Sequence, residues 1–126
     1  MVFALNSCSV GDDSNPIAGF AILAIQNVQV QETYPVNETS DILVTYSRPT
    51  DCYIFDGFAI QSQGNVYTIG VQAVLMNQPT CMDDSMNTFQ VPLEFTPQHT
   101  GEYILKFYAG SENNEPQYLE YTVTVE

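Results

Sequence analysis

The sequence predicts an all-β fold, a sandwich of seven or eight short antiparallel strands, and three observations support this prediction. Apolar and polar residues alternate, most strictly from Phe89 to Phe95, as they do in strands that bury one face. Turn residues such as those from Gln63 to Asn65 separate the alternating runs. No stretch carries the i, i+3, i+4, i+7 repeat of an amphipathic helix. A chain of 126 residues, 44% hydrophobic and 13% charged, suffices for one domain with its own core.

Each expected strand is an apolar or alternating run between turn signals. In chain order the runs are Phe20 to Val30, Ile42 to Tyr46, Cys52 to Ile60, Val66 to Leu75, Phe89 to Phe95, Tyr103 to Phe107 and Tyr118 to Val125. Gln26 and Asn27 interrupt the first run, which predicts a bulge or a change of sheet. Asp56 and Gly57 predict a bulge or a tight turn. Pro92 cannot donate a ladder hydrogen bond and therefore indicates an edge strand. The segment from Gly110 to Pro116 is expected to be a long polar hairpin loop.

A corner between two strands is the most specific structural signal in the chain. Pro97 and Gly101 end one alternating run, and Tyr103 begins the next, two residues after the glycine. Sandwiches turn from one sheet to the other in this way, with the tyrosine ring in the core and its hydroxyl bonded to the corner backbone. We therefore expect Pro97, Gly101 and Tyr103 to form a structural corner.

This motif, extended through Leu105 and Phe107, resembles the F strand of immunoglobulin-like domains. The resemblance implies an immunoglobulin-like β-sandwich over residues 17–126. Leu105 stands where antibody domains carry their second cysteine, and the chain has no Trp. The inter-sheet disulfide and the core Trp of antibody domains are therefore absent.

The first residues resemble the signal of a bacterial surface lipoprotein. An apolar run ends in Leu5-Asn6-Ser7-Cys8, which is similar to a lipobox, and the acidic segment from Gly11 to Ser14 is similar to the tether of Bacteroidetes surface lipoproteins. The resemblance implies that residues 1–16 are a truncated signal and flexible tether, and that a lipid on Cys8 anchors the domain at the outer membrane or cell surface. No Lys or Arg precedes Cys8. Either the start has been trimmed or mis-called, or Cys8 is an ordinary thiol.

Cys52 and Cys81 are the remaining cysteines. In an exported protein two such cysteines are expected to form a disulfide, whereas in a cytosolic protein they would be free thiols. The spacing is not CxxC and no His lies nearby, which argues against a redox or metal role.

The charge of the chain is strongly negative. Two basic residues stand against 15 acidic ones, and the net charge of −13 repels phosphate backbones and anionic lipids. We therefore expect no nucleic-acid partner, and membrane contact only through a lipid on Cys8. Two acidic segments supply weak calcium candidates, Asp83 and Asp84 in one and Glu112 and Glu115 in the other. Neither has EF-hand spacing, so solvated loops are the favoured interpretation and no metal or cofactor is predicted.

Catalytic motifs are missing from the sequence. His99 is the only His, and there is no nucleophile elbow or zinc motif, so we do not expect an enzyme. Six tyrosines are candidates for a sugar- or protein-binding surface, although the lack of Trp argues against a carbohydrate platform. They are Tyr34, Tyr53, Tyr67, Tyr108, Tyr118 and Tyr121.

The sequence thus favours an exported binding or structural module without catalytic activity, whose partner is an unknown surface protein or glycan. Two alternatives remain open. One is an accessory or hydrolytic domain of a surface system that uses glycans or proteins. The other is a subunit of a surface polymer assembled by strand exchange.

Overall fold

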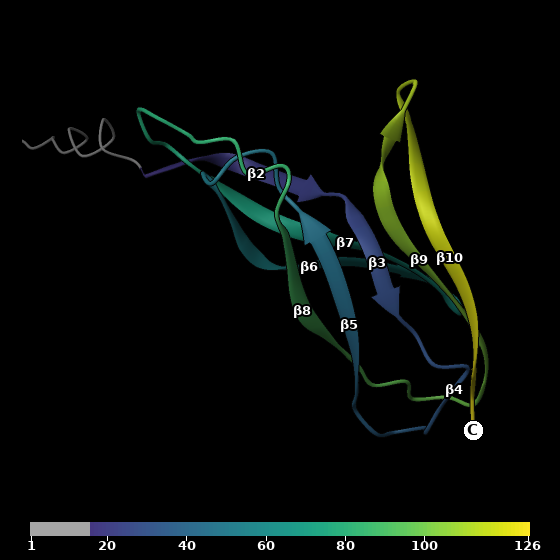
Figure 1. The fold of residues 1–126 in the computed structure, drawn as a ribbon. Helices are drawn as coiled ribbons and strands as arrows, with labels where there is room; N and C mark the ends of the chain where they lie inside the picture. The colour runs from purple at the N-terminus through teal and green to yellow at the C-terminus, as the bar shows by residue number, and fades with distance from the viewer. Residues whose placement is uncertain (1–15) are drawn as a thin grey trace, which may run out of the picture.

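The computed structural model describes residues 16–126, which fold into nine strands in two sheets (Figure 1). The strands are β2 (Ile17–Leu23), β3 (Ile25–Gln29), β4 (Thr33–Tyr34), β5 (Ser40–Ser47), β6 (Tyr53–Gln63), β7 (Val66–Met76), β8 (Thr88–Phe95), β9 (Gly101–Glu112) and β10 (Glu115–Val125). The larger sheet has the order β2-β7-β9-β10-β4, with β6 on the opposite edge of β7, and the smaller sheet has the order β3-β5-β8. The predicted all-β, sandwich-like fold is confirmed. Residues 16–126 contain no helix that could cross a membrane.

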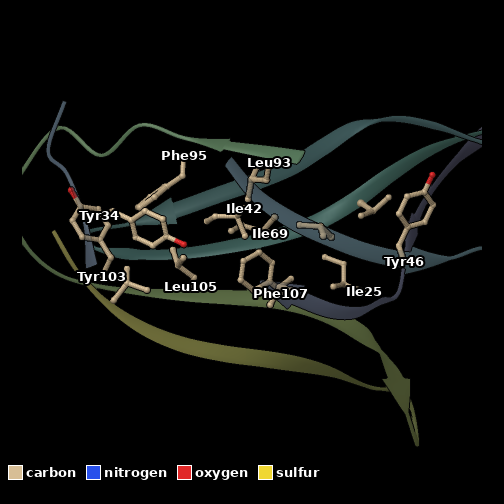
Figure 2. Close-up of a cluster of buried hydrophobic side chains, with 14 of the residues drawn as sticks. Ile25, Tyr34, Ile42, Tyr46, Ile69, Leu93, Phe95, Tyr103, Leu105 and Phe107 are labelled. Carbon is tan, nitrogen blue, oxygen red and sulfur yellow. The ribbon is translucent and has the colours of Figure 1, made fainter. Parts of the chain in front are cut away.

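The core lies between the inner faces of the two sheets (Figure 2). Alternation in β5 turns Ile42 and Val44 inward, and alternation in β9 does the same for Leu105 and Phe107. All four side chains are fully buried. Burying a side chain of this size contributes about 1.5–3 kcal/mol, so the period of two in the sequence fixes which face of each strand packs inward.

Several local predictions are confirmed. The ladder between β6 and β7 shifts register between Phe55 and Phe58, and Gly57 there has a φ of 106°, so this feature is a bulge. Pro92 lies in β8, which pairs only with β5 and is therefore an edge strand. Ala24 alone connects β2 in the larger sheet to β3 in the smaller one, and the register shifts again between Ile25 and Asn27.

Two predictions are wrong. The pairings are not all antiparallel, because β7 runs parallel to β9 and β4 runs parallel to β10. Since β8 lies in the other sheet, the chain crosses over between β7 and β9, and such a crossover allows two strands to run parallel. The expected loop from Gly110 to Pro116 is also mostly strand. Asn113 and Asn114 alone form the turn, with φ values of 53° and 66°, as a two-residue hairpin with both central residues left-handed requires.

One edge of β7 changes partner in the middle of the strand. Val66 to Ile69 pair with β9, whereas Val71 to Met76 pair with β2. Beyond Phe107, β9 therefore leaves β7 and continues with β10 as a hairpin arm, whose tip stands apart from β2 and β7 in Figure 1. Gly70 lies at this fork. A Cβ atom there would be 2.6 Å from Cγ2 of Ile22, so the approach of β2 requires glycine.

Candidate functional site

The outer face of β7 forms the floor of a groove. Ile69 and Val71 point into the core, so the alternating residues Val66, Thr68 and Gly70 point outward. Their side chains are small or absent, and the floor is therefore low. Two hollows of about 340 and 580 Å³ lie over it and adjoin each other, because Gln61 and Thr68 line both, and together they form the groove.

Neighbouring strands supply the walls. On one side, β6 places Ala59 opposite Gly70, Gln61 opposite Thr68 and Gln63 opposite Val66. On the other side, the residues come from β2, β9 and β10: Ile22, Lys106, Tyr108 and Tyr118. One end of the groove is consequently apolar and aromatic, and the other end carries neutral amides, two hydroxyl groups and one ammonium group.

The aromatic wall is held by contacts on the hairpin arm. Tyr108 and Tyr118 are cross-strand partners whose ring centroids lie 6.2 Å apart at an interplanar angle of 69°. The Tyr108 hydroxyl lies 3.0 Å from the Ser111 hydroxyl, and Nζ of Lys106 lies 4.8 Å from the centroid of the Tyr118 ring. Tyr118 remains 36% exposed. Its ring is therefore positioned but still accessible to a ligand.

Charge in the groove differs from charge on the rest of the chain. No acidic residue lines either hollow, although the protein carries 15. The two basic residues also differ. Arg48 donates from Nε to Asp84 at 2.7 Å and from a terminal guanidinium nitrogen to the carbonyl of Tyr53 at 2.8 Å. The contact between Arg48 and Asp84 is the only ion pair within residues 16–126. Lys106 therefore forms no ion pair with a carboxylate of the described residues.

The predicted disulfide and corner are structural features outside the groove. Cys52 and Cys81 form a disulfide with a Cα–Cα distance of 5.5 Å, which ties the start of β6 to the loop after β7. At the corner, the Tyr103 hydroxyl donates to the carbonyl of His99 at 3.0 Å. Pro97 is buried, and Gly101 has a φ of 127°. The predicted lipidation site, Cys8, lies outside the described residues.

The four calcium candidates form two separate pairs. Asp83 accepts hydrogen bonds from the backbone and hydroxyl of Ser85, which lower the pKa of its carboxyl group. The pKa of Asp84 is lowered by the Asn87 amide and by Arg48. Glu112 and Glu115 face each other across the hairpin tip. In the part of the chain that the structure describes, no three potential metal ligands come together.

The structure separates the six candidate tyrosines. Tyr34 is buried, and its hydroxyl accepts a hydrogen bond from the backbone of Gln31. Three others are partly buried against the core: Tyr53, Tyr67 and Tyr121. Only the remaining two, Tyr108 and Tyr118, line the groove. His99 lies at the corner with an exposed side chain and contributes its carbonyl.

The sequence did not indicate the floor or the neutral wall of the groove. Gly70 was the available signal, because a glycine inside a strand often marks a close approach of another segment. Gln61 and Thr68 carry no signal of their own, since they gain a role only when β6, β7 and β9 lie side by side.

No protein-family model, curated protein or solved structure matches this chain. Similarity therefore assigns neither a family nor a function.

Proposed function

We propose that this protein is an exported, non-catalytic binding module that is anchored at a bacterial cell surface through a lipid on Cys8 and binds its ligand in the outer groove of the larger sheet. The observation that carries the binding role is the groove itself, which combines an accessible aromatic wall with neutral hydrogen-bonding groups. The disulfide between Cys52 and Cys81 supports export, because disulfides persist in oxidising compartments.

We place the domain among immunoglobulin-like sandwiches as a variant. The hydrogen bond from Tyr103 to the corner backbone supports this placement, as does the packing of a second sheet over the strands that follow the corner. The variation lies in the β6–β7 hairpin. Its second strand, β7, lies beside β9, which is the counterpart of strand F. In immunoglobulin domains strand F lies instead beside strand C, the first strand after B. An experimental structure that is superimposable on immunoglobulin domains through β5, β8, β9 and β10 would support the placement.

Lipid anchoring is tested in a Bacteroidetes host that expresses the native gene. The cells are grown with an alkyne fatty acid, and the label on the protein is measured. We expect the label on wild type and its loss in Cys8→Ser. A Cys52→Ala/Cys81→Ala variant is the matched control and should keep the label, because only Cys8 is the proposed acceptor. Labelled Cys8→Ser protein would contradict the anchoring proposal.

Binding in the groove is tested with three immobilised classes of polymer: neutral polysaccharides, polygalacturonate and polylysine. We expect the full chain to bind at least one class and Tyr118→Ala to lose that binding. Ile54→Ala is the matched control, because Ile54 is 45% exposed on the outer face of the same sheet but does not line the groove. Binding that is equal in wild type and Tyr118→Ala for every polymer would show that the groove is not the site.

Strand exchange is supported by free sheet edges among the described strands, at β3 and β8 in the smaller sheet and at β6 in the larger one. The bulge at Gly57 interrupts the edge of β6, and Pro92 lies on β8; bulges and prolines on an edge both hinder the docking of a further strand. Ligand binding in the groove is therefore the function that we favour.

A further inference from the structure

We infer that the ligand of the groove is a neutral, linear glycan whose pyranose rings lie along the outer face of β7. This inference rests on the proposed function, since it names the chemical class of ligand for the same groove. Four features of the groove support it: its shape, its aromatic end, its free amides and its charge.

Shape favours a chain over a compact ligand. The two hollows adjoin at Gln61 and Thr68 and follow the direction of β7 from Gly70 toward Val66. Both hollows lie on the outer face of the sheet and are open to solvent. An extended polymer can occupy such a groove residue by residue, and its ends can continue beyond the protein.

The aromatic end offers a surface for one sugar ring. Tyr118 is exposed, and Tyr108 supports it from the side at an interplanar angle of 69°. The C–H face of a pyranose ring is apolar and can stack on such a tyrosine, while Ala59 and Ile22 line the hollow beside it. A flat platform of Trp residues is absent, so we expect one stacked sugar and contacts to the others through hydrogen bonds.

The other end carries hydrogen-bonding groups that the protein does not use. Among the described residues no side-chain hydrogen bond engages Gln61, Gln63 or Thr68, whereas Gln72 donates to Asp56 and Gln26 donates to Ser47. An amide both donates and accepts hydrogen bonds, as does a hydroxyl group. This pairing suits sugar hydroxyls, each of which also donates and accepts.

Charge argues for a neutral glycan. A net charge of −13 repels a polyanion, and Lys106 is the one basic residue of the groove. A cationic peptide would be expected to meet carboxylates, yet none lines either hollow. Lys106 can instead donate to sugar hydroxyls while its ammonium group lies over the Tyr118 ring.

The test is affinity gel electrophoresis of the full chain in gels that contain one neutral polymer each: mixed-linkage β-glucan, xylan, mannan or a soluble α-glucan. We expect retardation by at least one of them. The dissociation constant should rise about tenfold in Tyr118→Ala and about threefold to tenfold in Gln61→Ala. Ile54→Ala should bind like wild type, because Ile54 lies outside the groove.

The outcomes separate the two proposals. In one outcome, polygalacturonate or polylysine retards the chain in a Tyr118-dependent manner while none of the four neutral polymers does. That result overturns the inference of a neutral glycan, and the groove remains a binding site. If a neutral polymer retards wild type and Tyr118→Ala equally, the binding lies elsewhere and both proposals are wrong. Absence of any binding to the four neutral polymers overturns the glycan inference.

Discussion

Tyr103→Phe removes one hydroxyl group and leaves the core otherwise unchanged. The Tyr103 side chain is only 2% exposed, and its ring lies 5.7 Å from the Tyr67 ring and 5.9 Å from the Phe95 ring, measured between centroids. Phenylalanine keeps both contacts. The variant loses the 3.0 Å hydrogen bond to the carbonyl of His99, which is at the surface and can accept from water instead. The expected cost is therefore the net value of one hydrogen bond, about 1 kcal/mol.

Urea and thermal unfolding at neutral pH measure this cost. We expect the free energy of unfolding to fall by about 1 kcal/mol with an unchanged m-value, and the melting temperature to fall by about 3–5 °C for a chain of this length. Tyr108→Phe is the control, because the Tyr108 hydroxyl bonds to Ser111 at an exposed position and its loss should cost less than about 0.5 kcal/mol. A Tyr103→Phe variant as stable as Tyr108→Phe would refute the assignment of a stabilising role to the corner.

Two further predictions concern the disulfide and the fork in the larger sheet. Replacing Cys52 and Cys81 with alanine should lower the free energy of unfolding by about 3–4 kcal/mol, because the bridge closes a loop with a sequence separation of 29 residues. Reductant should lower the free energy of unfolding of wild type in urea by the same amount and should not change that of the double variant. Wild type that is equally stable with and without reductant would contradict the prediction. Gly70→Ala should cost about 1–3 kcal/mol, because the new Cβ would lie 2.6 Å from Cγ2 of Ile22. Ile22→Ala in the same chain should remove most of that cost, and an equal cost in both backgrounds would show that the clash is not the cause.

Local signals in the sequence predict much of the fold. Pro92 indicates an edge strand because it lacks a donor, and Gly57 indicates a bulge or a tight turn because glycine can adopt a φ that other residues avoid; the structure shows the bulge. The spacing of Gly101 and Tyr103 predicts a bond that depends on only a few consecutive residues. Each of these features is decided within a short segment, which is why sequence reasoning finds it.

Features that depend on distant partners were not predictable in the same way. The parallel pairing of Val66 to Ile69 with β9 depends on which strands the crossover through β8 brings together, and hydrophobic alternation does not encode that choice. The turn at Asn113 and Asn114 was mistaken for a longer loop, because the flanking residues are polar on the hairpin arm. The alternation that marks a half-buried strand is weak where a strand leaves the core.

The groove follows from the same fork that the sequence did not indicate. At Gly70, β2 replaces β9 as the neighbour of β7, and the absence of a Cβ atom there admits the side chain of Ile22, which lines the hollow. Because β9 leaves β7 at this point, the hairpin arm of β9 and β10 diverges from β7. Tyr118 on β10 then lines the hollow between the arm and β7. A side chain at position 70 would therefore displace Ile22 and so disturb both the packing of β2 and the lining of the groove. The irregularity in strand pairing is thus the physical origin of the site that we propose for ligand binding.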